Sequence, residues 1–394
     1  MKIAIATPTL YESVSPYNHL FSDILEGFLS AGYSVVRYAA CRSESDTDFT
    51  YGLDAVEHHR CVRKESGRGN IISRYLRDSF TAFSEARGVR KSDADVLFED
   101  VSYCSHFFVR AAARRGMKIV AMVQDVWPDN AVQTGLIRKG GLLYRFFESV
   151  QRYVYRKADR IVCISDDIRA FLIEKGIPAE KIEVIYNWGY GDAPVSIPWE
   201  ENRFVQKYGL SKDRFYAVYA GNIGRMQNVG LVAEAAALLQ ADEKIRFLIV
   251  GDGVKRDEIS AAVKDMPNVT MLPMQPQSLA EHVYSAAGVN LIPLQPGGAK
   301  TAMPSKTAVI LSCGRPTVFC FGADASFTGR LGQYPGCESV DPGDAQALAD
   351  AIRAMKNAPK TDGPAALFVE LFTRSKNIAR YADAVRFDRQ EGTR

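Results

Sequence analysis

Long apolar runs and paired cysteines are both missing from this sequence. No apolar segment approaches membrane-spanning length, and the first residues run directly into a strand pattern, so we expect neither a signal peptide nor a transmembrane anchor. The seven cysteines are scattered, which favours reduced thiols in a cytoplasmic protein. The five histidines form no cluster beyond the adjacent pair His58 and His59, and no metal site is expected.

An excess of one charge is missing too, because 49 lysines and arginines are balanced by 46 acidic residues, for a net charge of +3. This balance argues against a nucleic-acid partner bound through bulk charge. The first expected strand-to-helix turn, residues 8–16, lacks the spaced glycines of a dinucleotide fingerprint. That absence lowers the expectation of NAD or FAD as a cofactor.

The sequence does contain a repeated α/β pattern. Residues 3–7 are an expected strand, residues 17–31 a helix that stops at Gly32, and residues 33–39 the next strand. This order is the opening of a doubly wound domain with a parallel sheet.

The length and one composition shift predict two domains. At 394 residues the chain exceeds the size at which a single core usually stops growing. Residues 186–202 are rich in glycine, proline and tryptophan, which is typical of a linker. We therefore expect a first domain over residues 1–190 and a second over residues 200–371.

One loop of the second half has the features of an anion site. An expected strand over residues 289–294 leads into a glycine-containing loop, and Pro304-Ser305-Lys306 then opens a helix with Ser305 as its N-cap. Backbone N–H groups at a helix N-terminus favour an anion such as a diphosphate. The candidate ligands in this stretch are Gly298, Lys300, Thr301, Ser305 and Lys306. An ordinary connection with two solvated lysines remains the alternative reading.

Two further strands of the second half end in small-residue loops. The strand over residues 216–220 is followed by Gly221, Asn222, Gly224 and Arg225, and that over residues 245–250 by Gly251 and Gly253. Each glycine pair is a weak signal, because glycine also serves tight turns that bind nothing. Three such loops at one sheet edge favour a site for a phosphate and a base.

Polar residues also follow strands of the first half. Glu99, Asp100, Asp125 and Asp129 stand just past strand ends, where open α/β sheets bind their ligands. Asp100 and Asp129 are more simply explained as turn caps, whereas Asp125 lies next to a buried-looking Trp-Pro pair. In the loop after the first strand, four residues are candidates to touch a substrate, although loop polarity also explains them: Ser13, Ser15, Tyr17 and Asn18.

The segment 142–157 is expected to be an amphipathic helix. Its apolar side holds Leu143, Phe146, Phe147, Val150 and Val154. Its other side is basic, with candidates for contact with an anionic membrane surface at Arg145, Arg152 and Arg156. A core-packed helix with a solvated face is the alternative.

Several motifs in this order resemble the family 4 retaining glycosyltransferases of the GT-B fold. They are Gln124-Asp125-Val126-Trp127-Pro128, Ala158 to Ser165, Tyr186-Asn187-Trp188, Gly221-Asn222-Ile223-Gly224, Val250-Gly251-Asp252-Gly253, Pro304-Ser305-Lys306 and Gly314-Arg315-Pro316. The sequence is most similar to the branch of bacterial capsule, O-antigen and colanic-acid assembly. The first hundred residues match that family only in the alternation of expected strands and helices.

The resemblance implies two Rossmann-like domains that face a cleft, with helices of residues 372–394 crossing back to the first domain. It implies that the first domain holds the acceptor and the second a nucleotide sugar, more often UDP than GDP. The acceptor would be a lipid-linked glycan at the inner membrane face, and no metal or cofactor is implied. The protein would chiefly stabilise charge on the departing diphosphate.

The chain departs from the family pattern at two places. The family carries two glutamates eight residues apart, and the corresponding positions here are Thr301 and Val309. Valine cannot accept a hydrogen bond from a ribose hydroxyl. The family's basic pair is also altered, with Asn222 and the dipeptide Gln227-Asn228 at the corresponding places.

These observations give a site hypothesis with two rivals. Asp125 is the candidate beside the anomeric carbon, with Glu99 in reserve, while Arg225, Lys300 and Lys306 would supply the missing positive charge. Because Val309 removes one nucleotide contact, a non-catalytic scaffold subunit of a glycan assembly complex is the first rival. A UDP-sugar epimerase on the same fold is the second.

Overall fold

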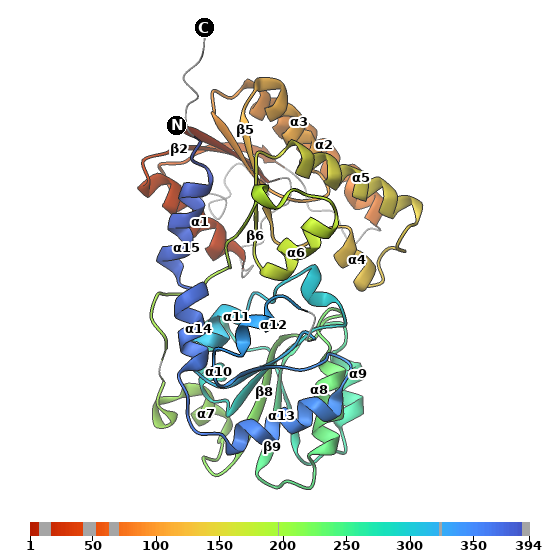
Figure 1. Cartoon of the computed structure of the whole chain (residues 1–394), viewed down its shortest axis with the longest axis vertical. Coiled ribbons are helices and arrows are strands. Elements are labelled where there is room, and N and C mark those ends of the chain that lie inside the picture. Colours follow the sequence, from red (N-terminus) through yellow and green to blue (C-terminus); the bar gives the residue numbers. More distant parts are fainter. Residues whose placement is uncertain (8–16, 42–52, 63–70, 196, 323–324, 388–394) are drawn as a thin grey trace.

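The structure is a computed structural model, and it describes the chain except for residues 8–16, 42–52, 63–70, 196, 323–324 and 388–394. Two parallel sheets lie one above the other, each covered by helices on both faces (Figure 1). The α/β class with two Rossmann-like domains is therefore confirmed.

The first sheet has seven strands in the order β3-β2-β1-β4-β5-β6-β7, all parallel. Its strands are β1 Lys2–Thr7, β2 Ser34–Cys41, β3 Glu57–Val62, β4 Val96–Asp100, β5 Lys118–Val123, β6 Arg160–Cys163 and β7 Ile182–Val184. Its helices are α1 Tyr17–Ser30, α2 Ile71–Lys91, α3 Ser105–Arg115, α4 Asp129–Gln133, α5 Leu142–Lys157 and α6 Asp166–Glu174. The strand order reverses at β1 and β4, so the ligand-binding edge of this sheet is the end at which these strands finish.

The second sheet has six parallel strands in the order β10-β9-β8-β11-β12-β13. Its strands are β8 Phe215–Asn222, β9 Ile245–Asp252, β10 Val269–Leu272, β11 Val289–Pro293, β12 Thr317–Cys320 and β13 Cys337–Ser339. Its helices are α7 Arg203–Tyr208, α8 Val229–Leu238, α9 Arg256–Val263, α10 Ala280–Ser285, α11 Thr307–Ser312, α12 Thr328–Leu331, α13 Ala345–Asn357 and α14 Gly363–Leu371. Here the order reverses at β8 and β11.

The last helix, α15 Arg374–Ala384, leaves the second domain and packs on the first (Figure 1). Tyr381 of α15 is fully buried between the rings of Phe98 and Trp188, at centroid distances of 6.0 and 5.8 Å. At the start of α15, Arg374 makes two hydrogen bonds to the Asp23 carboxylate of α1, at 2.9 and 2.7 Å. These contacts hold α15 against the first domain, beside α1.

Two local expectations are wrong. Residues 304–307 form a turn in which Thr307 N–H donates to Pro304 O at 3.0 Å, so α11 begins only at Thr307. The cap position is therefore occupied by Lys306 instead of Ser305, and it makes no side-chain capping bond. In α5, Phe147, Val150 and Val154 are buried as expected, but Leu143 and Phe146 are exposed.

The rotation of α5 has a physical cause in its amphipathic side chains. Tyr144 and Gln151 are buried because each finds a polar partner: the Tyr144 hydroxyl donates to Asp129 at 2.9 Å and the Gln151 amide to Ser102 O at 2.9 Å. Tyr155 is buried on the same side. Large side chains with a polar tip thus fill core positions that a count of apolar residues assigns elsewhere.

Candidate active site

A cavity of about 500 Å³ lies between the two domains. The first domain lines it with the segment after β5, including Asp125 and Trp127, and the second with residues 302–305 and Gln227. Both segments follow the carboxyl ends of parallel strands, where α/β sheets bind their ligands. Of the predicted site residues, Asp125 and Ser305 line this cavity.

The two domains are joined directly beside the cavity. Asp125 and Ala302 form an isolated antiparallel β-bridge, and the Val126 N–H donates to Thr301 O at 2.9 Å. The side-chain amide of Gln133 in α4 adds two more hydrogen bonds: its Nε2 donates to Gly297 O at 2.7 Å, and its Oε1 accepts from the Thr301 hydroxyl at 2.7 Å. The predicted residues Asp125 and Thr301 are thus brought together, although Thr301 is engaged by protein.

The Asp125 side chain is open to solvent in the cavity but is surrounded by protein on its other sides. Desolvation raises the pKa of this carboxyl to about 6. No hydrogen-bond or ion-pair partner for its carboxylate is found among the residues that the structure describes. It can therefore accept a hydrogen bond from a bound hydroxyl or stabilise positive charge that develops nearby.

Glu99 lies elsewhere. It is fully buried in β4, between Ala6 of β1 and Ala121 of β5, and does not line the cavity. Burial raises the pKa of its carboxyl well above the usual value. The structure therefore does not bring this reserve candidate to the site.

The glycines at the ends of β8 and β9 are explained first by the packing of the two strand ends. Gly221 and Gly251 are paired in register, with φ values of 143° and 156°, and a Cβ on Gly251 would lie 1.9 Å from Gly221 O. A Cβ on Gly253 would lie 2.5 Å from Ile223 O, and one on Gly224 would lie 2.7 Å from the Asn222 amide. Neither these four glycines nor Asn222 line the cavity.

Lys306 lies at the end of β8. Its Nζ donates to Ala220 O at 3.0 Å and lies 3.8 Å from the centroid of the Tyr219 ring. Desolvation lowers the pKa of this amine to about 7, so the charged and neutral forms have similar populations near neutral pH. No acidic partner of this amine is found among the residues that the structure describes, so the weakly solvated cation is well suited to an incoming anion.

Arg225 and Lys300 do not line the cavity themselves. They lie at its rim, one and two residues before the lining residues Met226 and Ala302, and both contact the first domain. The Arg225 guanidinium donates to Thr134 O at 3.4 Å, and the Lys300 amine lies 4.0 Å from the Glu174 carboxylate. Gly298 is buried in the turn before Lys300. A rim position near solvent makes these pairs weak, so either cation can turn toward a ligand at low cost.

Other expectations fall outside the described residues. Ser13 and Ser15 lie in the segment 8–16, and the side chains of Tyr17 and Asn18, the first residues of α1, are likewise not described. The arginines of α5, Arg145, Arg152 and Arg156, are exposed on the first domain. They lie outside the cavity lining.

Sequence reasoning missed several polar residues of the site. Gln124 and Asn187 exchange reciprocal amide hydrogen bonds at 2.7 and 3.3 Å and line the cavity, as does Gln227. Gln133, which joins the domains, was missed as well. Gln124 and Asn187 lie within the motifs quoted above, but their pairing depends on how β5 and the linker meet.

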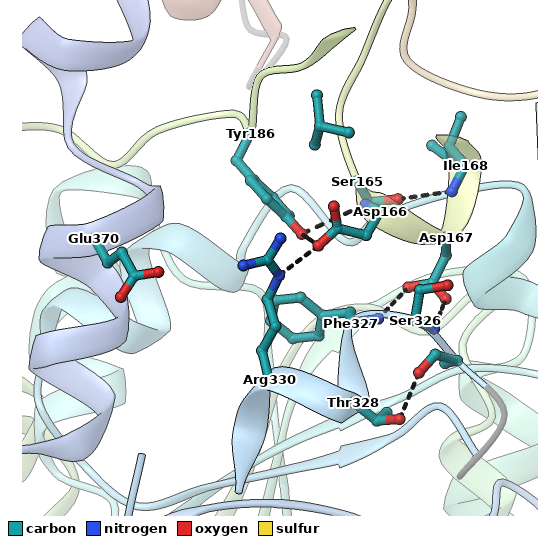
Figure 2. Close-up of polar contacts among 12 residues, drawn as sticks. Ser165, Asp166, Asp167, Ile168, Tyr186, Ser326, Phe327, Thr328, Arg330 and Glu370 are labelled. Carbon is teal, nitrogen blue, oxygen red and sulfur yellow. Dashed lines mark hydrogen bonds and ion pairs between the residues drawn. The ribbon is translucent and has the colours of Figure 1, made fainter. Parts of the chain in front are cut away.

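A second contact between the domains lies around the start of α6 (Figure 2). Ser165 caps α6 by accepting a hydrogen bond from the Ile168 N–H at 3.1 Å. Asp166 accepts from the Tyr186 hydroxyl at 2.9 Å and from Arg330 Nε at 2.5 Å, and Asp167 accepts from two backbone N–H groups, those of Ser326 and Phe327. These carboxylates are fully engaged in holding the second domain.

The comparisons with known proteins agree with this geometry. Residues 18–188 match the family model of the glycosyl transferase 4-like domain, and residues 214–357 match that of the glycosyl transferases group 1. The chain belongs to the family 4 glycosyltransferases of the GT-B fold. The predicted family is thus confirmed, while retention of configuration stays a prediction.

Individual relatives are distant but span most of the chain. A protein named as glycosyltransferase WbjE, from Pseudomonas aeruginosa, is 24% identical over 82% of this chain and 82% of its own. One named as colanic acid biosynthesis glycosyl transferase WcaI, from Escherichia coli, is 27% identical over 71% and 70%.

Among solved structures, HepE of Anabaena in complex with UDP and glucose has a TM-score of 0.72 at 15% identity and covers 98% of this chain and 99% of its own. Sucrose-phosphate synthase of Thermosynechococcus elongatus has a TM-score of 0.73 at 16% identity and covers 97% of each chain. At this identity the likeness shows the shared fold.

Within the described part of the chain, no group of three or more His, Cys, Asp or Glu side chains could hold a metal ion. None of the helices described there combines the length and the apolar character that a membrane span needs.

Proposed function

We propose that this glycosyltransferase moves a sugar, with retention of configuration, from a nucleoside diphosphate, most simply UDP, to a lipid-linked glycan of a bacterial surface polysaccharide. The cavity shared by Asp125 of one domain and Ser305 of the other is the observation that carries this proposal. The UDP complex of HepE and the name of WcaI support the choice of donor and pathway.

The diphosphate lies at the ends of β8 and β11 in this proposal. Lys306 contacts the diphosphate from the end of β8, while Lys300 and Arg225 approach it from the rim of the cavity. As the bond from the anomeric carbon to the phosphate oxygen breaks, negative charge grows on the diphosphate and these cations stabilise it. The proposal assigns this work to the chain's own side chains, so turnover should persist in excess EDTA.

The acceptor hydroxyl attacks the anomeric carbon from the face that the diphosphate leaves, and its proton passes to the departing phosphate oxygen on that face. Asp125 orients this hydroxyl or stabilises the positive charge of the oxocarbenium-like sugar. Its carboxylate is suited to both tasks because it has no described partner and faces the cavity. Trp127, two residues further on, adds an apolar wall.

The missing ribose contact has a candidate substitute in Glu281 of α10. The Cys313 thiol donates to the backbone oxygen of Glu281 at 3.6 Å, and Cys313, the C-cap residue of α11, follows Val309 by four residues, about one helical turn. The Glu281 side chain lines a separate cavity of about 380 Å³ with Tyr190 and Gln277. Its carboxylate has no partner among the described residues, and burial raises its pKa.

The acceptor's lipid places the enzyme at the inner face of the plasma membrane in this proposal. The exposed guanidinium groups of Arg145, Arg152 and Arg156 contact anionic headgroups. Such contacts should weaken as the salt concentration rises.

A thermal-shift panel of UDP, GDP, ADP and dTDP tests the donor site, because a ligand that binds only the folded state raises the melting temperature. A rise with UDP is expected, and it should shrink in Glu281→Gln. No rise with any of the four at millimolar ligand would instead support a non-catalytic subunit, the alternative that Val309 favours. Release of UDP from UDP-sugar that depends on an added lipid-linked acceptor would separate transfer from epimerisation.

A further inference from the structure

A second, smaller cavity lies in the first domain next to the interdomain cavity, and Trp127 lines both of them. We call it the side pocket, and its volume is about 260 Å³. Besides Trp127, it is lined by Gln151 and Tyr155 of α5 and by Glu174 and Lys175 at the end of α6. The proposed chemistry does not use it.

The side pocket also lies close to the second domain. Helix α6 packs against residues 298–300, which stand just before the cavity-lining Ala302, and it lies at the edge of the first domain that faces the second (Figure 1). The Glu174 carboxylate of the side pocket is 4.0 Å from the Lys300 amine at the rim of the interdomain cavity. A ligand in the interdomain cavity therefore has the side pocket as its neighbour.

Buried polar atoms of the side pocket lack hydrogen-bond partners. The Tyr155 hydroxyl and Gln151 Oε1 have none among the residues that the structure describes, and the two residues are only 3 and 2% exposed. Trp127 Nε1 is in the same state. The Gln151 amide is held in place because its Nε2 donates to Ser102 O at 2.9 Å. A donor, an acceptor and a hydroxyl that are costly to bury unpaired favour a ligand with several hydroxyl groups.

The charges and the volume narrow the class of ligand. The lining holds two carboxylates and two cations: Glu148, Glu174, Arg152 and Lys175. An ion would meet as much repulsion as attraction there, whereas sugar hydroxyls can donate to the carboxylates and accept from the cations. At about 30 Å³ per water, a cavity of about 260 Å³ equals roughly nine waters and has room for one sugar ring.

We propose that the side pocket binds one uncharged sugar residue of the acceptor, adjacent to the residue whose hydroxyl lies at Asp125. This inference rests on the proposed function, in which the acceptor glycan enters the interdomain cavity. The enzyme then extends a glycan that already carries at least two sugars. The reaction that supplies its acceptor is therefore itself a glycosyl transfer to a lipid-linked sugar.

Saturation-transfer NMR of the full chain tests the site without donor or turnover. The probes are the methyl glycosides of glucose, galactose, mannose, rhamnose and N-acetylglucosamine, with methyl glucuronide and glucose 6-phosphate as charged counterparts. At least one neutral probe should bind, and Tyr155→Phe should weaken its binding by about three- to tenfold because one hydrogen bond is lost.

Tyr153→Phe is the matched control, since Tyr153 is a half-buried residue of the same helix that lines neither cavity. It should bind the probe as the native chain does. The melting temperature of Tyr155→Phe should not fall, because its hydroxyl has no described partner to lose. A purely structural role of this hydroxyl predicts a lower melting temperature with unchanged sugar binding, and that result would overturn the proposal.

Disaccharides test the position of the site along the acceptor. Methyl disaccharides that contain the bound sugar should bind more tightly in at least one linkage, and Asp125→Asn should remove only this gain. Binding by the charged probes alone, or by none of the probes at high millimolar concentration, would overturn the proposal. So would a monosaccharide whose affinity falls in Asp125→Asn but not in Tyr155→Phe. Sugar binding without any transfer would retain the side pocket and refute the proposed function, whereas transfer without sugar binding would do the reverse.

Discussion

Asp125 and Asp167 occupy comparable places with opposite surroundings. Both follow neighbouring strands of the first sheet, β5 and β6, and both lie where the second domain meets the first. Asp167 accepts hydrogen bonds from two backbone N–H groups of the second domain, whereas the Asp125 carboxylate has no partner among the described residues. The same sheet edge thus carries one carboxylate that holds the domains and one that is available to a substrate.

The comparison shows how a carboxylate that holds the domains together can be distinguished from one that is available to bind a substrate at the same sheet edge. A carboxylate whose oxygens are occupied by protein donors is stabilised as an anion and has little capacity for a ligand. A carboxylate that is partly desolvated and has no hydrogen-bond donor is destabilised in its ionised form. A substrate hydroxyl that donates to it lowers this free-energy cost. Three predictions test the distinction and one extends it to the amine of Lys306, beginning with the largest effect.

Asp125→Asn should lower turnover by about 100-fold or more, because it removes the negative charge while it keeps the shape of the side chain. UDP release in the presence of acceptor measures this effect. Glu99→Gln is the matched control, since Glu99 is an inward carboxyl of the adjacent strand that lies outside the cavity. A greater loss in Glu99→Gln than in Asp125→Asn would reverse the assignment.

Asp167→Ala should act on stability instead. It leaves the N–H groups of Ser326 and Phe327 without their charged acceptor, which should lower the free energy of unfolding by about 2 kcal/mol. Urea unfolding followed by circular dichroism measures this loss. Asp213→Ala removes an exposed carboxylate of the second domain and should change stability little. Equal losses in the two variants would contradict the role given to Asp167.

Lys306→Met should weaken UDP binding by about tenfold while it leaves the fold intact, because methionine replaces the buried stem without the charge. The lowered pKa adds a signature. An anion beside the amine favours its charged form, so UDP binding at pH 8 should take up a proton. Calorimetry in buffers of different ionisation enthalpy detects this uptake, which should vanish in Lys306→Met. Proton uptake that persists in the variant would assign it to another group.

The sequence was sufficient to predict the α/β class and the glycine-containing strand ends, because periodicity and local turn chemistry determine them. The contact of Gln133 with Thr301 was not predictable, since it depends on how the two domains dock. The register of α5 was missed because Tyr144 and Gln151 are buried through polar partners from other segments. The state of Asp125 was also beyond local pattern, because a pKa near 6 reflects the whole environment.

The smallest expected effect is the pH dependence that follows from Asp125. Desolvation raises the pKa of Asp125 to about 6. If its ionised carboxylate acts in transfer, kcat/KM should be constant above pH 7 and fall about tenfold per pH unit below pH 6. Near neutral pH the change in kcat/KM is less than twofold, so the measurement must extend to pH 5.

The same raised pKa stabilises the folded protein below about pH 4, and this contribution is lost as pH rises through 6. Asp125→Asn should remove both dependences, whereas Asp167→Ala should keep the acidic limb of kcat/KM. An acidic limb that survives in Asp125→Asn would belong to another group and would remove Asp125 from the contrast with Asp167.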